Sequence, residues 1–194
     1  MVCTAADYAW FDERYGRLSR SYRLTLVADL SVAEAALRIG GTDPEVLPGS
    51  SIVDGAAPAH TVAVTETPGW ALLLETAVSP GAAALPVAGL SRGTTLVAHG
   101  VAGPVSSFLW MHDATEELAF DPARPWRRTG RSADSQVGVM AEVGFPMDAD
   151  GHGESPAALS LAFADYLTGV RLGPDELRSL LYLRVSVEPG PGEP

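Results

Sequence analysis

The sequence predicts an α+β fold, an antiparallel sheet of about five strands with helices packed on it. Segments that alternate polar and apolar residues lie mostly early in the chain, and segments with helical spacing lie mostly late. Short turns join successive strand segments, which favours an antiparallel meander. The chain has 194 residues, of which 46% are hydrophobic and 19% charged, enough for one folded core. We expect one domain over residues 1–188 and a disordered tail, PGPGEP, over residues 189–194.

The N-terminal part predicts a helix, a strand and a second helix. Asp7 can cap a short aromatic helix over residues 8–15. Residues 22–30, YRLTLVADL, alternate as a strand does. Ser31 and Glu34 then have the S-x-x-E spacing of a capping box, so a helix follows this strand.

The next segments predict a long loop followed by a hairpin. Residues 42–59 contain three prolines and no sustained period, so we expect an exposed loop. Residues 60–66 alternate, Pro68 and Gly69 supply a turn, and the strand WALLLETA returns from Trp70. This second strand is apolar on both faces, which predicts a central strand with Trp70 as a core anchor.

The remaining elements follow the same two patterns. A short helix broken by Pro86 is expected over residues 79–90. Strands are expected over residues 94–100, 106–113 and 116–122, helices over residues 137–143, from Ser155-Pro156 to Gly169 and from Gly173-Pro174, and a last edge strand over residues 182–188.

The charge of the chain limits its partners. The formal net charge is -11, which disfavours binding to nucleic acid or to an anionic membrane, and favours a solvated acidic surface or a basic partner. The first ten residues lack the basic and apolar regions of a signal peptide, and no stretch reads as a membrane helix. We therefore expect a soluble, cytoplasmic protein. All 13 basic residues are arginine, and with many Ala, Gly and Pro residues this suggests a GC-rich, actinobacterial genome.

Motifs for metal, phosphate or nucleophilic chemistry are missing from the sequence. Cys3 excludes an internal disulfide and a multi-cysteine metal site, and we interpret it as inert. No G-x-S-x-G elbow and no phosphate-binding loop occur. The histidines are too far apart for a metal-binding pair; they are His60, His99, His112 and His152. If the strands on either side of residues 100–104 pair, His99 and Ser107 are neighbours.

One acidic segment resembles the start of a calcium loop. DADGHGE, residues 148–154, places Asp148, Asp150 and a glycine at suitable positions, but Leu159 stands where a bidentate glutamate is needed. We interpret it as an acidic linker, and we expect neither a metal nor a cofactor.

The clearest local anomaly is the segment DPARPWRRTGRSAD, residues 121–134. It contains Arg124, Trp126, Arg127, Arg128 and Arg131. Arginine forks bind carboxylate or phosphate, and an exposed tryptophan can anchor an interface. The segment is therefore a candidate docking loop for an acidic peptide, a phosphorylated ligand or a partner protein. The alternative is structural: the arginines offset nearby acids and the tryptophan packs on the sheet.

A second candidate is a pocket over the sheet near Trp110, His112 and Asp113. Neighbouring residues on a strand point to opposite faces, so His112 and Asp113 cannot form the orienting pair of a hydrolase directly. The aromatic residues of the chain can line such a pocket, or they can form core; they are Tyr8, Trp10, Phe11, Trp70, Phe108, Trp110 and Phe120.

Five blocks of sequence together resemble an uncharacterised actinobacterial family, a domain of unknown function. The blocks are DYAWFDE, LTLVADLSVAEAALRIGG, GWALLLE, SSFLWMHDATEELAFDP and YLTGVRLGPDEL. The resemblance covers residues 7–187 and implies a similar single-domain fold, with no activity and no catalytic residues to transfer.

Two hypotheses for function result. The first is a non-enzymatic protein-binding module, acting as an immunity, inhibitor or accessory component through the arginine-rich segment. The second is a small-molecule-binding protein or hydrolase with a pocket near His112 and Asp113.

Overall fold

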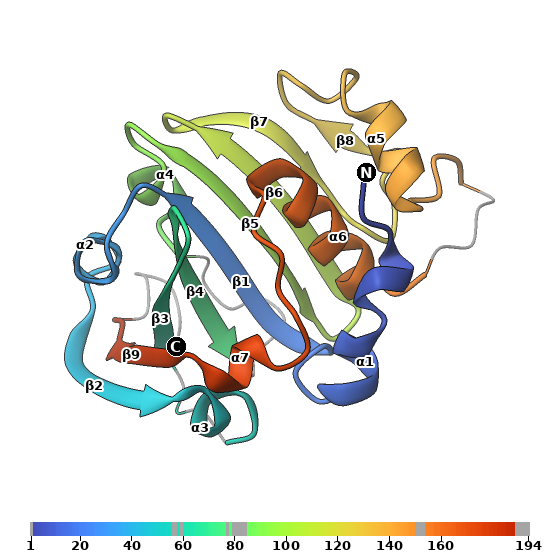
Figure 1. The fold of residues 1–194 in the computed structure, drawn as a ribbon. Coiled ribbons are helices and arrows are strands. Elements are labelled where there is room, and N and C mark those ends of the chain that lie inside the picture. The colour runs from blue at the N-terminus through green and yellow to red at the C-terminus, as the bar shows by residue number, and fades with distance from the viewer. Residues whose placement is uncertain are drawn as a thin grey trace.

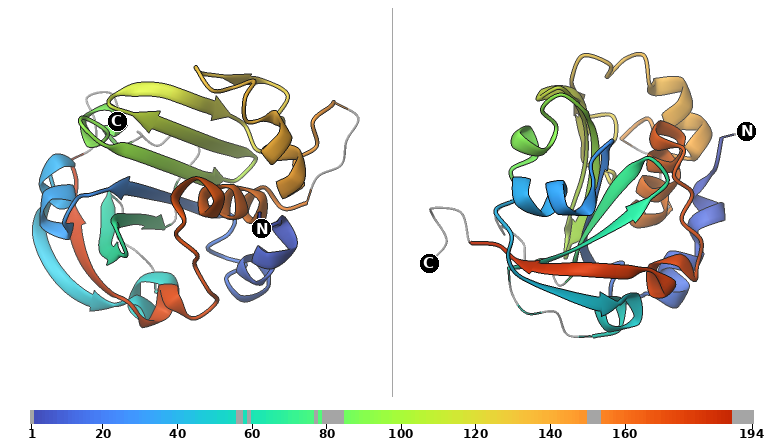
Figure 2. Two further views of the ribbon diagram at one scale, coloured as in Figure 1. Left: turned by 45° about the horizontal axis from the view of Figure 1, so that its top comes forward. Right: turned by 60° about the vertical axis from the view of Figure 1, so that its left-hand side comes forward.

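The fold is an antiparallel sheet with helices on both faces (Figure 1; Figure 2). The computed structural model describes residues 2–55, 58, 60–76, 78, 85–149 and 154–188. Within these residues the α+β class is confirmed. The expected tail over residues 189–194, and the first half of the helix expected over residues 79–90, lie outside the described residues.

The sheet is larger than the sequence pattern predicts. The described residues form a 9-stranded sheet where about five strands were expected. The strands are β1 (Ser21–Ala28), β2 (Thr42–Pro48), β3 (Thr61–Thr67), β4 (Trp70–Thr76), β5 (Thr95–Ala102), β6 (Val105–His112), β7 (Thr115–Phe120), β8 (Arg128–Thr129) and β9 (Leu181–Ser186).

The strand order is β2-β9-β3-β4-β1-β5-β6-β7-β8. The β3–β4 hairpin and the run from β5 to β8 are meanders. A meander is wrong for the whole sheet, because β1 inserts between β4 and β5, and β9 inserts between β2 and β3. These insertions pair strands that are remote in the sequence, so no local turn signal announces them.

Two expectations fail at the β2 edge of the sheet. Residues 42–59 were expected to be a loop, but they contain β2 and the helix α3 (Gly49–Val53). β2 shows no alternation because it is an exposed edge strand with two prolines and an irregular register at Asp43. β9 was expected to be an edge strand and instead lies between β2 and β3, with β2 outside it (Figure 1).

The helices follow the sequence signals more closely. They are η1 (Ala5–Tyr8), α1 (Trp10–Arg14), α2 (Val32–Arg38), α4 (Val87–Leu90), α5 (Val137–Val143), α6 (Pro156–Thr168) and α7 (Glu176–Ser179). The capping box at α2 is confirmed: the amide of Glu34 donates to Ser31 Oγ at 3.2 Å. The N-terminal helix is capped differently from the expectation, since Thr4 is the N-cap of η1 and Asp7 bonds back to it.

Each face of the sheet has its own apolar core. On the α6 face, α1, α5 and α6 cover alternate residues of β1, β5, β6 and β7, among them Leu24, Val97, Phe108 and Phe120. On the α2 face, α2 and α4 cover Val27, Leu73 and Leu96. The right-hand view of Figure 2 shows these two helix layers with the sheet between them. β4 is buried on both faces, which confirms it as a central strand.

Candidate functional site

The arginine-rich segment forms the β8 edge of the sheet. Residues 121–136 connect β7 to α5 and include the short strand β8, which pairs with β7 through Arg128 and Thr129 (Figure 1). We call these residues the arginine loop. The loop lies at the edge opposite β2, where its side chains are not covered by another strand of the sheet.

The start of the arginine loop is fixed by Asp121. Its Oδ1 accepts hydrogen bonds from Ser106 Oγ at 2.5 Å and from the amide of Ala123 at 3.0 Å. The main chain then turns twice, because the amide of Arg124 donates to the Asp121 carbonyl and that of Arg127 to the Arg124 carbonyl. A loop held in this way is preorganised, which lowers the entropic cost of binding.

Arg128 holds the loop together from inside. Its Nε donates to the Ala133 carbonyl at 3.0 Å and its Nη1 to the Pro125 carbonyl at 3.4 Å. Nη2 also lies 3.5 Å from a carboxylate oxygen of Asp134, and the side chain is only 18% exposed. Arg128 therefore supports the loop and does not present a free guanidinium group.

The turn after β8 needs a glycine. Gly130 has φ 110, and a Cβ atom there would lie 2.3 Å from the carbonyl oxygen of Glu117. The close approach lets the amide of Ser132 donate to the same carbonyl at 2.8 Å. The second half of the arginine loop is thereby tied to β7.

The other arginines of the loop point outward. Arg124, Arg127 and Arg131 are exposed. Arg124 makes one long ion pair, 3.8 Å from Asp121. Within the described part of the chain, no hydrogen bond or ion pair engages the side chains of Arg127 and Arg131. Trp126 is half-buried beside them, so its ring is neither core nor fully exposed.

Two carboxylates of β7 beside the loop accept hydrogen bonds from hydroxyl groups of the loop. Thr129 Oγ1 donates to Glu116 Oε1 at 2.6 Å, and Ser132 Oγ donates to Glu117 Oε2 at 2.9 Å. Both glutamates belong to β7, next to the loop. The loop therefore combines fixed main chain, outward guanidinium groups and neighbouring acids that are held by other partners.

In the second candidate site, the side chains of His112 and Asp113 bond to different partners. His112 Nδ1 lies 3.0 Å from Thr95 Oγ1, whereas Asp113 Oδ1 accepts from the amide of Gly93 at 2.8 Å. Asp113 occupies a two-residue turn with φ 44, followed by Ala114 with φ 57, a pair typical of a type I′ hairpin turn. Asp113 thus shapes the turn, and it does not orient His112.

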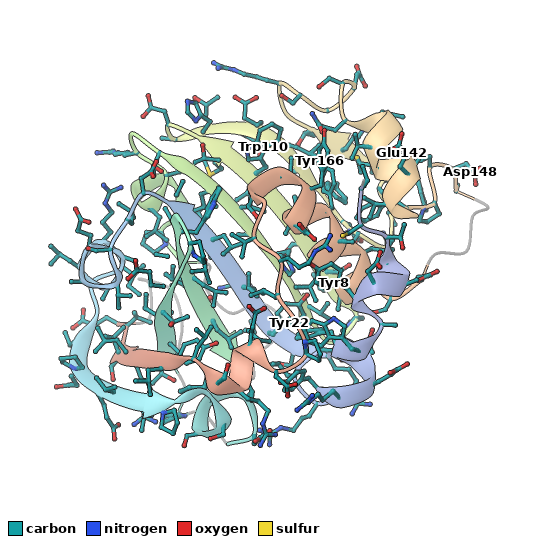
Figure 3. The ribbon with its side chains drawn as sticks, in the orientation of Figure 1. Tyr8, Tyr22, Trp110, Glu142, Asp148 and Tyr166 are labelled. Atoms are coloured by element: carbon teal, nitrogen blue, oxygen red, sulfur yellow. The ribbon has the colours of Figure 1, made fainter. Side chains whose placement is uncertain are left out.

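Trp110 lies on the α6 face of the sheet. It pairs with Val97 and Leu118 and packs partly buried against the core. Figure 3 labels it near Tyr166 of α6. The aromatic set is mainly core: Tyr8, Phe11, Phe108 and Phe120 are buried, and Trp10 and Trp70 are partly buried against the same core cluster.

The sequence did not single out a buried tyrosine–histidine pair that the structure brings together. Tyr22 of β1, labelled in Figure 3, lies on the α6 face, and its Oη is 3.0 Å from Nδ1 of the buried His99 of β5. Burial lowers the pKa of His99 to about 3, so the ring is neutral. The expected neighbour of His99 was Ser107, but the register places Phe108 opposite it, since the turn centres on Gly103 and Pro104. His99 shares one face of β5 with Val97 and Val101, and this apolar pattern could have predicted that the histidine is buried.

A second polar cluster anchors the N-terminus. Tyr8 Oη and Arg171 Nε each donate to Asp165 Oδ2 at 3.0 Å, and Arg171 also contacts Cys3 Sγ. Tyr8 lies under α6 in Figure 3. Burial raises the pKa of the Cys3 thiol, which disfavours the reactive thiolate. The cluster joins the chain start to α6 and the segment after it.

Other features of the described residues add no second site. A cavity of about 20 Å³, room for about one water molecule, lies at the end of β3, β4 and β9, lined by Ser51, Ile52, Thr61, Ala63, Leu74, Thr76 and Arg184. The described residues contain no cluster of His, Cys, Asp or Glu that could hold a metal ion. Asp150 and His152 of the calcium-like segment lie outside them. In the same part of the chain, every helix is too short or too polar to cross a membrane.

Comparisons with known proteins identify the family. No curated protein and no solved structure matches the chain. A family model described as a family of unknown function, DUF6461, matches residues 1–189. Since the match covers nearly all of the sequence, the chain belongs to this family of unknown function.

Proposed function

We propose that this protein is a binding module that recognises another protein through the arginine loop. The observation that carries the proposal is the state of Arg127 and Arg131. Both side chains are exposed and unengaged within the described residues, on a loop whose main chain is fixed by hydrogen bonds. Charged groups held in this way give specificity and fast association at an interface.

A structural role accounts for Arg128 and leaves the other two arginines unexplained. Arg128 makes the contacts that hold the loop together. Arg127 and Arg131 contribute no such contact, so they can be lost at little cost in stability. Trp126, half-buried and directly before Arg127 in sequence, supplies a flat apolar ring of the kind that anchors interfaces.

The net charge favours a protein partner over nucleic acid. A duplex presents about one phosphate charge per 1.7 Å, and the negative field of a protein with a formal charge of -11 repels it at long range. A protein partner can contact the arginine loop alone. In an actinobacterial cytoplasm, which the composition predicts, such a module would act as an inhibitor, immunity or accessory component.

The test compares two charge-matched double variants as baits in lysate of the native host. Arg127→Gln/Arg131→Gln removes the two outward charges of the loop. Arg20→Gln/Arg92→Gln removes two exposed arginines elsewhere that also make no side-chain contact within the described residues. We expect the same protein to be captured by the wild type and the Arg20/Arg92 variant, and lost with the loop variant.

Circular dichroism and thermal unfolding check that both variants remain folded. We expect changes in the free energy of unfolding within about 0.5 kcal/mol, because neither pair makes structural contacts. Equal capture by the two variants would refute the arginine loop as the binding surface.

A further inference from the structure

We infer that the hydroxyl groups of Thr129 and Ser132 keep the arginine loop open for a carboxylate-rich segment of the partner protein. The inference rests on the proposed function, since it names the chemistry of the ligand and the residues that make the site available. Thr129 and Ser132 are positioning residues: they act on the arginines through the neighbouring acids.

Glu side chains of β7 are internal competitors for Arg131 of the loop. Glu116 and Glu117 lie on β7 directly beside it, and the amide of Arg131 donates to the Glu116 carbonyl at 3.4 Å. A glutamate side chain at that place can reach a neighbouring guanidinium group, and such surface pairs contribute about 0.2–1 kcal/mol each. An arginine engaged in this way would have to break the pair before it binds a partner.

The hydroxyl groups weaken this competition, because each bonds one carboxylate oxygen and holds that glutamate side chain toward the hydroxyl. One oxygen of Glu116 accepts from Thr129 Oγ1 at 2.6 Å, and one oxygen of Glu117 accepts from Ser132 Oγ at 2.9 Å. Both hydroxyls belong to the loop: Ser132 directly follows the outward Arg131, and Thr129 lies two residues from Arg127 and two from Arg131. The same bonds also fix the loop to β7, so they orient the guanidinium groups while they hold the acids aside.

The ligand chemistry follows from the groups that remain. Guanidinium groups bind carboxylates through two parallel N–H bonds, and the exposed ones here are Arg124, Arg127 and Arg131. They are spread along the β8 edge: the pairing Phe120↔Arg128 and the Glu116 contact of Arg131 place Arg127 and Arg131 toward opposite ends of β7. An extended acidic segment that follows the edge can meet them in turn.

The test uses a labelled peptide of alternating glutamate and serine, followed by fluorescence anisotropy. Its glutamine counterpart and a labelled single-stranded oligonucleotide are the comparison probes. We expect the wild type to bind the glutamate peptide more tightly than either comparison probe. Thr129→Val/Ser132→Ala should weaken this binding about two- to thirty-fold, the effect of two surface ion pairs that now compete.

A rescue separates this effect from simple loss of structure. Adding Glu116→Gln/Glu117→Gln to the hydroxyl variant removes the competing charges and should restore binding to the wild-type level or above. Ser31→Ala is the matched control, because it removes a hydroxyl–glutamate bond of 2.8 Å at α2, far from the arginine loop in sequence, and should leave peptide binding unchanged.

The results with the hydroxyl variants and with the comparison probes test different parts of the inference. Unchanged binding by Thr129→Val/Ser132→Ala, or no rescue by the glutamine pair, overturns the role of the hydroxyls. Tighter binding of the oligonucleotide, or none of the glutamate peptide, overturns the acidic segment as ligand. The bait experiment with Arg127→Gln/Arg131→Gln stays independent of both, so the proposed function fails only with that experiment.

Discussion

Acidification should destabilise the fold through His99 well before most carboxylates titrate. The ring is buried, with its Nδ1 3.0 Å from Tyr22 Oη, and burial lowers its pKa from 6.5 to about 3. In the unfolded chain the imidazole regains its ordinary pKa. The unfolded state therefore binds more protons between these two values, and stability is lost as the pH falls through 6.5 toward 3.

The size of this loss in the free energy of unfolding follows from the protonation of His99 in the unfolded state. At about pH 5.5 an imidazole of ordinary pKa is about ten-elevenths protonated, which stabilises the unfolded chain by RT ln 11, about 1.4 kcal/mol. At about pH 7.5 the same quantity is below about 0.1 kcal/mol. The free energy of unfolding should thus fall by about 1.4 kcal/mol between the two pH values from His99 alone. Glu75 acts in the opposite direction, because burial raises its pKa and the folded state then binds the extra proton on acidification.

A variant isolates the histidine from other titrating groups. Tyr22→Phe/His99→Phe replaces the hydrogen-bonded pair by apolar rings of similar shape, a change that leaves no buried partner unsatisfied. Urea unfolding of the wild type and the variant at both pH values gives the difference in pH dependence. We expect the wild type to lose about 1.4 kcal/mol more than the variant. His112→Asn, at an exposed histidine, should behave as the wild type does. Equal losses in the wild type and the double variant would refute the burial of a neutral His99.

The arginine loop gives two predictions for stability. Arg128→Gln removes an internal support of the loop and should lower the free energy of unfolding by about 1–3 kcal/mol. Arg131→Gln should change the free energy of unfolding by less than about 0.5 kcal/mol. Equal effects of the two substitutions in urea unfolding would contradict the roles assigned to the two arginines. Gly130→Ala should destabilise by more than about 1 kcal/mol, because φ is 110 and the new Cβ would lie 2.3 Å from the Glu117 carbonyl oxygen. Gly138→Ala in α5, where a Cβ meets nothing within 4 Å, is the control and should stabilise by about 0.5–1 kcal/mol in the same assay.

Local signals in the sequence predicted local structure well. The strand β1, the Ser31–Glu34 capping box and the Pro68-Gly69 turn depend on residues close in the chain, and the structure confirms them. The alternation read in β1 does not describe its burial, since Leu24 to Val27 are all buried. β2 could not be predicted in this way, because its residues are exposed and its pairing partner β9 is supplied from the far end of the sequence. The same long-range pairing turned β9 from an expected edge strand into an interior one.

The candidate site was predictable in composition and not in detail. The clustering of arginines in the sequence singled out this segment. Sequence alone could not distinguish Arg128 from the outward Arg127 and Arg131, although Arg128 bonds the Ala133 and Pro125 carbonyls. That distinction depends on how the main chain turns at Gly130. The hydroxyl–carboxylate pairs of Thr129 and Ser132 depend on the register between the loop and β7, which no sequence period encodes.

The insertion of β9 between β2 and β3 has a consequence for the order of folding. The ribosome synthesises β2 early, but Thr42 of β2 pairs with Ser186 of β9. β2 therefore cannot pair until the ribosome has made β9, in which Ser186 lies 144 residues after Thr42. Until then one edge of β3 and all of β2 expose unpaired main-chain groups, the situation in which nascent sheets pair with the wrong chain. The two prolines and the irregular register of β2 make it a poor template during this interval. Features that hid the strand from sequence analysis therefore also protect the growing chain from aggregation.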